Sequence, residues 1–258
     1  MIKITTELIK ELRDATGISV MQCKRALEEA NGDMNKALAI LKKTSSDIAL
    51  KKADRNAKDG AVMVKTEGGK SVMVALRCET DFVSKNEDFV SLLNKLVNIA
   101  FENGIEKVKE VSKEMIDPII QKTGENIQLG DVFVVEGSVL GVYIHNNKKA
   151  TIVSLEGGNQ ELSRDIAMHI TAMKPEYIRK EDITAEAKST MLEIFQKEIA
   201  EVNKPEEIKK KMLEGKISTY FKEKTLINQP FIKNPDETIG KILEKAKAKI
   251  KEVKSYSI

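Results

Sequence analysis

The residues with the clearest potential for chemistry are Thr80, Asp81, Phe82 and Val83, where a carboxylate stands beside an aromatic ring. They follow an alternating strand pattern and precede a helix start, so we expect them to form a tight strand-to-helix corner. Rigid scaffolds often present functional side chains at such corners. What this pair does depends on the chemistry available elsewhere in the chain.

The rest of the chain offers no recognisable catalytic group. The two histidines, His145 and His169, and the two cysteines, Cys23 and Cys78, are separated and give no metal-ligand spacing. Apolar residues flank both cysteines, which predicts two buried, reduced thiols. No phosphate-binding glycine loop, dinucleotide fingerprint or nucleophile elbow is present. By elimination, the sequence predicts a binding protein that is not an enzyme and has no metal site or cofactor, with the Asp-Phe pair as its best candidate feature.

The overall composition favours a folded, cytoplasmic protein. Of the 258 residues, 41% are hydrophobic and only 4% aromatic, so we expect a core of Val, Ile, Leu, Met and Ala. The net charge of +3 is too balanced to favour direct binding to nucleic acid. No run approaches the ~18 apolar residues of a membrane span, and the first residues lack the apolar stretch of a signal peptide.

Residues 1–44 are predicted to form three short helices that share one core. Gly17 ends the first helix, Ser19 caps the second in a capping-box pattern, and Asp33 caps the third. This arrangement resembles a ubiquitin-associated (UBA-like) domain, a module that binds partners. Val20 and Met21 begin the second helix, and the pattern alone leaves open whether they are core residues or exposed contacts.

Residues 45–58 change in composition, with lysines and an arginine among small residues and aspartates. We interpret them as a basic, partly helical linker. A nucleic-acid-binding tail is the alternative, but the interleaved acids and the lack of aromatics weaken it.

The region after the linker repeats one unit, which predicts two similar sheet-plus-helix subdomains at 59–130 and 131–258 and an α+β fold. Each copy reads as a hairpin, a corner and a helix. The expected strands are 61–66 and 71–79 in the first copy, and 132–144 and 150–155 in the second. At the second corner, Gly157 and Gly158 stand where the first copy has its bulky aromatic residue.

Two features of the first corner are predicted from local pattern. Ser84 and Glu87 read as a capping box for the following helix. Strand parity would put Phe82 on the same face as Val72 and Val74, which favours a core position. Strand parity therefore argues against an exposed position for Phe82.

Within the second subdomain, residues 182–226 read as two helices joined at Pro205. Each would be roughly 25 Å long and would carry one apolar stripe, so we expect an inserted antiparallel coiled-coil hairpin. It could reach out as an arm or pack flat on the body. Asp236 is expected to cap a C-terminal helix, and 250–258 to add a strand.

Several islands of sequence are similar to the translation elongation factor Ts family. They follow the family's order and cover most of the chain: Leu12-Arg13-Asp14-Ala15-Thr16-Gly17, Cys23-Lys24-Arg25-Ala26-Leu27, Thr80-Asp81-Phe82-Val83, Ile166-Ala167-Met168-His169-Ile170 and Asn228-Gln229-Pro230-Phe231.

The resemblance implies a guanine-nucleotide exchange factor that binds elongation factor Tu in its GDP-bound and nucleotide-free forms. It implies that Asp81 and Phe82 intrude near the Mg²⁺ and phosphate site of that partner, with Thr80 and Val83 shaping the corner. It also implies that the three-helix domain docks on the partner through the region of Leu12, Val20 and Met21. The alternative is a non-catalytic adaptor that tethers partners through the three-helix domain and the hairpin.

Overall fold

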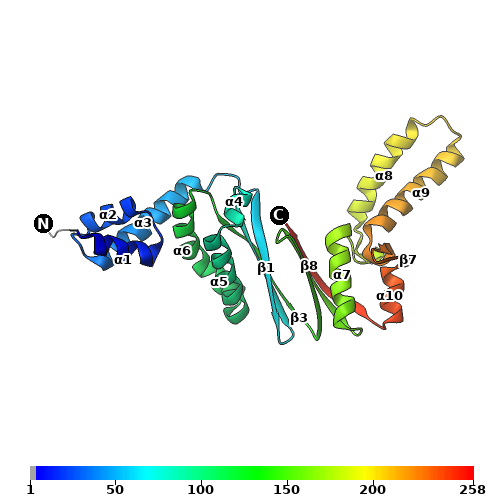
Figure 1. Cartoon of the computed structure of the whole chain (residues 1–258). Coiled ribbons are helices and arrows are strands. Elements are labelled where there is room, and N and C mark those ends of the chain that lie inside the picture. The colour runs from blue at the N-terminus through cyan, green and yellow to red at the C-terminus, as the bar shows by residue number, and fades with distance from the viewer. Residues whose placement is uncertain (1–3) are drawn as a thin grey trace. The chain divides into compact units, whose positions relative to one another are not determined.

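The structure, a computed structural model, describes residues 4–258 and divides into two units (Figure 1). Unit 1 runs to Glu136 and includes Ile144–Ala150 and Tyr256–Ile258. Unit 2 comprises Gly137–Tyr143 and Thr151–Ser255. Each unit has its own hydrophobic core, as the sequence repeat predicts.

The N-terminal part of unit 1 is the predicted three-helix domain, α1 (Thr6–Thr16), α2 (Val20–Glu29) and α3 (Met34–Lys52). Thr5, Ser19 and Asp33 cap these helices by accepting a backbone N–H each. The helices enclose one small core. Helix α3 continues beyond residue 44 through much of the predicted linker, where Ser45 and Ala49 are buried.

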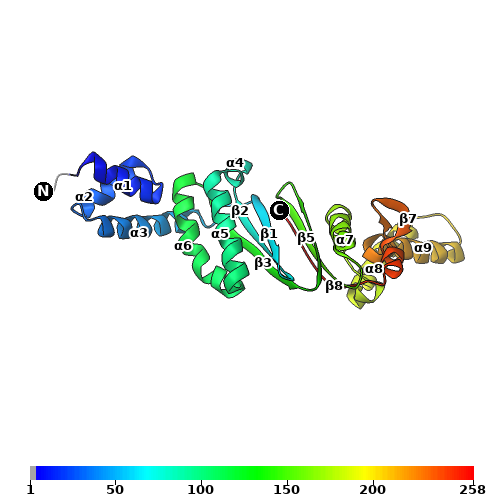
Figure 2. The same ribbon diagram turned by 60° about the horizontal axis from the view of Figure 1, so that its bottom comes forward.

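The rest of unit 1 is a three-stranded antiparallel sheet covered by helices. The sheet has the order β1-β2-β3, and Figures 1 and 2 show α5 and α6 on one of its faces. Every apolar side chain of β2 is buried, and its residues Val72, Val74 and Leu76 pack in the same core cluster as α5. The elements are β1 (Asp59–Glu67), β2 (Lys70–Cys78), α4 (Asp81–Ser84), α5 (Glu87–Asn103), α6 (Ile105–Thr123) and β3 (Gln128–Glu136).

One predicted strand proves to be two strands of different sheets. The sequence pattern favoured a single strand over 132–144 in the second copy, and this is wrong. Residues 128–136 form β3, which pairs with β2 in the first sheet, and β4 (Val139–His145) begins the second sheet. The two strands are separated at Gly137, where a Cβ atom would lie 2.2 Å from the Ser154 hydroxyl oxygen.

Unit 2 repeats the plan of the first sheet. Its strands have the order β4-β5-β8, so in both sheets a hairpin gains a third strand from later in the chain, paired with the second strand of the hairpin. The remaining elements of this sheet and its covering are β5 (Lys149–Glu156), α7 (Gln160–Met173), η1 (Lys180–Asp182), η2 (Leu226–Asn228), β6 (Pro230–Phe231), β7 (Asn234–Thr238), α10 (Ile239–Lys245) and β8 (Lys249–Ser257).

A helical hairpin is inserted in unit 2, as predicted. Helices α8 (Ala185–Ala200) and α9 (Glu206–Lys224) run side by side in Figure 1. Phe195 and Tyr220 meet edge to face with ring centroids 5.7 Å apart, and Lys216 forms an ion pair with Glu198 at 2.6 Å. Few residues of the hairpin are fully buried, so it contributes little to the core.

The cap predicted for the last helix is wrong by two residues. Thr238, not Asp236, is the N-cap of α10 and accepts the Lys241 N–H at 3.3 Å. Asp236 lies within β7, because residues 234–238 pair with β6 before the helix begins. None of the helices described is long and apolar enough to cross a membrane.

Candidate functional site

The predicted corner contains a one-turn helix of its own. Thr80 has extended backbone and caps α4 by accepting the Val83 N–H, and Asn86 caps α5 by accepting the Asp88 N–H at 2.9 Å. The capping box predicted at Ser84 is therefore wrong. Ser84 is buried at the end of α4, and its hydroxyl donates to the Asp81 carbonyl at 3.1 Å.

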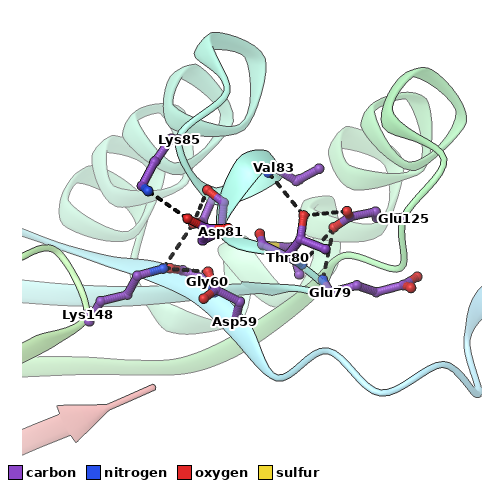
Figure 3. Close-up of polar contacts among 11 residues, drawn as sticks. Asp59, Gly60, Glu79, Thr80, Asp81, Val83, Lys85, Glu125 and Lys148 are labelled. Carbon is purple, nitrogen blue, oxygen red and sulfur yellow. Dashed lines mark hydrogen bonds and ion pairs between the residues drawn. The ribbon is translucent and has the colours of Figure 1, made fainter.

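Glu125 clamps the start of the corner from the segment that follows α6 (Figure 3). One of its carboxylate oxygens accepts the N–H groups of Glu79 and Thr80 at 3.1 and 3.0 Å, and the other accepts the Thr80 hydroxyl at 2.6 Å. The Glu79 carboxylate in turn accepts the N–H of Asn126, the residue after Glu125, at 2.7 Å. These bonds fix the backbone from which α4 projects.

Lys148 supports the corner from the side (Figure 3). Its ammonium group pairs with Asp59 and donates to the Gly60 carbonyl at 2.7 Å and to the Ser84 hydroxyl at 3.0 Å. Burial alone would raise the pKa of Asp59, but hydrogen bonds from Lys148 and the Gly60 N–H, together with the charge of Lys148, hold it below its ordinary value. The carboxylate therefore stays ionised and keeps the lysine in place.

The two anchoring residues were not found from the sequence. Glu125 and Lys148 lie 45 and 64 positions away from the corner residues Thr80 and Ser84 that they bind. The only local signal is that Glu125 follows Gly124, a left-handed helix C-cap that turns the chain sharply.

The turn of α4 decides the question that strand parity left open. The strand ends at Cys78, and successive helical residues point about 100° apart, so parity no longer applies beyond it. Val83 is 9% exposed and belongs to the core, whereas Phe82 is 83% exposed. A large aromatic side chain thus stands in solvent on a firmly held turn.

The Asp81 carboxylate is half-exposed and already paired. It accepts from the Lys85 ammonium group at 2.7 Å, one helical turn later. The hydrogen bond that Lys85 donates to Asp81, and the negative charge of Asp81, raise the pKa of Lys85. Asp81 therefore presents an anion whose charge is partly balanced by a neighbour on the same surface.

Cys78, just before the corner, is fully buried, as the sequence predicts. Its thiol donates to the Thr80 carbonyl at 3.2 Å. Burial, with smaller contributions from the charges of Asp59 and Glu125, raises its pKa to about 12. The thiol is therefore protonated at neutral pH and acts as a small packing group.

The residues implicated in docking by the N-terminal domain differ in exposure. Val20 and Met21, in the first turn of α2, are 49% and 59% exposed. Leu12 has no exposed surface and lies in the core of the three helices. In this structure Leu12 offers nothing for a partner to touch, so it can act on docking only by supporting the helices.

Residues 4–258 contain no group of three or more His, Cys, Asp or Glu side chains arranged to hold a metal ion. The corner presents an exposed aromatic ring, an anion and a backbone held by several hydrogen bonds, a combination that suits contact with another molecule.

Comparison with known proteins agrees with this architecture. The family model described as "Elongation factor TS" matches residues 79–258, and the one described as "UBA-like domain" matches residues 5–41. The chain is 39% identical over 253 residues to "Elongation factor Ts" of Marinobacter nauticus, covering 95% of this chain and 88% of the relative. The chain belongs to the elongation factor Ts family.

Other members of the family are similarly close. "Elongation factor Ts" of Thioalkalivibrio sulfidiphilus is 38% identical over 269 residues, covering 99% of this chain and 92% of the relative. That of Aeromonas hydrophila is 39% identical over 260 residues, covering 97% and 89%. The matched region of the elongation factor Ts family includes the corner and both of its anchors, Glu125 and Lys148.

Proposed function

We propose that this protein is a guanine-nucleotide exchange factor for elongation factor Tu and speeds GDP release during translation elongation in the cytoplasm. The observation that carries the proposal is the exposed Phe82 on its anchored turn. The factor would bind both the GDP-bound and the nucleotide-free partner. It would not contact nucleic acid or a membrane.

The exposed ring supplies the free energy for the proposed action. Burying a phenylalanine side chain stabilises a complex by about 1.5–3 kcal/mol relative to leaving it in water. That gain is absent in the free factor, where Phe82 is 83% exposed. A site in the partner that accepts the ring only when the nucleotide pocket is distorted would convert this gain into weaker GDP binding.

The rigidity of the corner matters for the proposed role of Phe82 as a wedge, a side chain that pushes into the nucleotide site of the partner. If the corner were flexible, Phe82 would move and the partner's site would not. The backbone of Thr80 is held by both oxygens of Glu125, and Lys148 holds Ser84 at the other end of α4. The turn between these two anchors carries Asp81 and Phe82.

Asp81 would act on the electrostatics of the partner's site. A GTPase holds its nucleotide with backbone N–H groups and a Mg²⁺ ion that bridges phosphate oxygens. A carboxylate brought close to that site competes for the positive charge that holds the phosphates. Lys85 moderates this effect by pairing with Asp81. In the complex, Lys85 would either stay paired with the Asp81 carboxylate or separate from it.

Docking by the N-terminal domain would hold the factor on the GTPase while the corner acts. Val20 and Met21 form adjacent exposed apolar side chains at the start of a capped helix. We assign the direct contacts to them and a supporting role to Leu12.

The decisive experiment is stopped-flow release of a fluorescent GDP analogue from purified elongation factor Tu, with and without this protein. Phe82→Ala is expected to reduce the exchange rate about 10- to 150-fold, since each 1.4 kcal/mol corresponds to a factor of ten. Its thermal stability should match that of the unchanged protein, because the side chain is exposed.

Val90→Ala is the matched control, since Val90 is an apolar residue of α5 that is 37% exposed and lies outside the corner. It should leave exchange unchanged. If Phe82→Ala retained full exchange activity, the proposed role of Phe82 as a wedge would be wrong. If the unchanged protein bound elongation factor Tu without accelerating GDP release, the adaptor alternative would be favoured.

A further inference from the structure

A cavity of about 600 Å³ lies at the base of the helical hairpin in unit 2. Residues of α9 from Glu214 to Lys222 line it, together with Lys180 and Ile183 before α8 and Lys188 in the first turns of α8. Small-molecule sites in proteins typically measure about 300–1,000 Å³, so the cavity is large enough for an organic ligand. It belongs to neither the corner nor the exposed start of α2.

Three apolar side chains, Ile183, Ile217 and Phe221, lie among the polar residues that line the cavity. Ile183 and Phe221 are 5% and 8% exposed, and Ile217 lies one helical turn before Phe221. A side chain or ring placed here would contact aliphatic and aromatic carbon on more than one side. Such a surface favours a ligand with an apolar body.

The rim of the cavity is positively charged. Lys180, Lys188 and Lys222 line it, and Glu214 is the one carboxylate among the lining residues. Within residues 4–258, none of these three lysines forms an ion pair, whereas other lysines of the same hairpin do, such as Lys216 with Glu198. The rim therefore offers positive charge that a ligand could use.

We propose that this cavity binds a small organic anion with an apolar body. The apolar part would lie on Phe221 and Ile217, and the anionic group would reach Lys188 and Lys222. The apolar and anionic halves of the ligand contribute to binding in different ways. Burial of carbon scales with area, and the charged contacts supply orientation.

The probe is naphthalene-1-sulfonate, titrated into the full-length protein by isothermal calorimetry at low salt. We expect saturable binding to one site. Lys188→Gln and Lys222→Gln should each weaken the affinity about fivefold or more, since a hydrogen bond to a charged group is lost. Lys210→Gln is the matched control on the same helix and should bind as the unchanged protein does, because Lys210 does not line the cavity.

Two further experiments test the contributions of the charge and the ring and the location of the site. Inorganic sulfate and 1-naphthalenemethanol, which carry the charge and the ring separately, should each bind at least about tenfold more weakly than the probe. Ser218→Phe places a ring in the cavity from an exposed helical position and should abolish binding without unfolding the protein, which circular dichroism would verify.

The proposal is overturned if the probe shows no saturable binding at millimolar concentration. It is also overturned if Lys210→Gln weakens binding as much as Lys188→Gln does, or if Ser218→Phe remains folded and binds normally. None of these results depends on nucleotide exchange.

Discussion

At the scale of single residues, Glu125 is the side chain on which the corner depends most. It accepts two backbone N–H groups and one hydroxyl from residues 79 and 80. A carboxylate has enough lone pairs to accept all three, whereas an amide side chain has one oxygen and must turn its NH₂ group toward the remaining donors. The charge of Glu125 is therefore part of the structure.

We predict that Glu125→Gln destabilises the protein by about 1–3 kcal/mol, because at least one donor at the corner is left unpaired. Equilibrium urea unfolding measures the change, and hydrogen exchange at the Thr80 amide should become faster. Glu87→Gln, an exposed change in the first turn of α5, is the control and should have a much smaller effect. Equal stability of the two variants would show that the clamp contributes nothing.

His169 is the second residue with a structural role that its surroundings define. It is fully buried in unit 2, where its Nε2 lies 2.9 Å from the Gln229 side-chain oxygen and its Nδ1 accepts the Ile232 N–H at 3.2 Å. A ring that accepts at Nδ1 and donates at Nε2 is neutral. Burial lowers the pKa of His169, although the hydrogen bond to Gln229 opposes the shift.

We predict that the protein loses stability as pH falls below about 6.5, the ordinary pKa of histidine. The unfolded chain takes up a proton there before the folded chain does, so protonation stabilises the unfolded state first. The contribution is fully present above that pH and is lost as pH falls toward the lower, folded-state pKa. Urea unfolding at pH 7.5 and 5.5 measures it.

His169→Gln should reduce this pH dependence, whereas His145→Asn, which removes the other histidine, should retain it. The protection of the Ile232 amide against hydrogen exchange, measured relative to the intrinsic rate at each pH, should also fall at low pH in the unchanged protein. An identical pH profile in all three proteins would exclude His169 as the cause.

At the scale of elements, the two corners differ because their backbones differ. Gly157 has φ of 76°, and a Cβ atom there would lie 2.4 Å from the Lys247 carbonyl oxygen, so this position in unit 2 needs glycine. The first corner uses extended backbone at Thr80 followed by a helical turn, which accepts any side chain. The first corner can therefore carry a bulky residue, and the second cannot.

Helix α10 tests how much a single cap contributes. We predict that Thr238→Ala destabilises the protein by about 1 kcal/mol, because it removes the acceptor for the Lys241 N–H. Asp236→Ala should cost much less, since Asp236 is an exposed residue of β7. Thermal unfolding of the two variants gives the comparison. A larger loss from Asp236→Ala would contradict the assignment of the cap.

At the scale of the whole molecule, the proposed function is an exchange of binding free energies. If the factor weakens GDP binding to elongation factor Tu by some ratio, GDP must weaken factor binding by the same ratio. Couplings of this kind are typically ~1–3 kcal/mol, which corresponds to about 5- to 150-fold. Under this proposal no covalent step is needed, because incoming nucleotide would displace the factor.

We predict that this protein binds GDP-saturated elongation factor Tu more weakly than the nucleotide-free form. The ratio of the two affinities should equal the ratio by which this protein weakens GDP binding. Calorimetric titrations in both directions measure the two ratios. Phe82→Ala should bring both closer to one, together. A change in only one ratio would violate linkage and would show that a further species is present.

The sequence by itself determined most of the helices and strands, although it merged β3 with β4 and missed the one-turn helix α4. Caps such as Ser19 and Asp33 and the apolar spacing of the helices are local signals, because they involve residues only three or four positions apart. The repeat predicted two similar subdomains, and family resemblance predicted the elongation factor Ts family; both are confirmed. The roles of Phe82, Val20 and Met21 in partner binding stay proposals.

Only the tertiary structure decided which sheet residues 128–136 join, which side chains anchor the corner and whether Phe82 faces solvent. Each depends on contacts between segments tens of residues apart, such as Thr80 with Glu125, and pairing of that range leaves no periodic trace in the sequence. The exposure of Phe82 follows from one such contact. Glu125 fixes the backbone at Thr80, the helical turn begins there, and the turn directs Val83 inward and Phe82 outward.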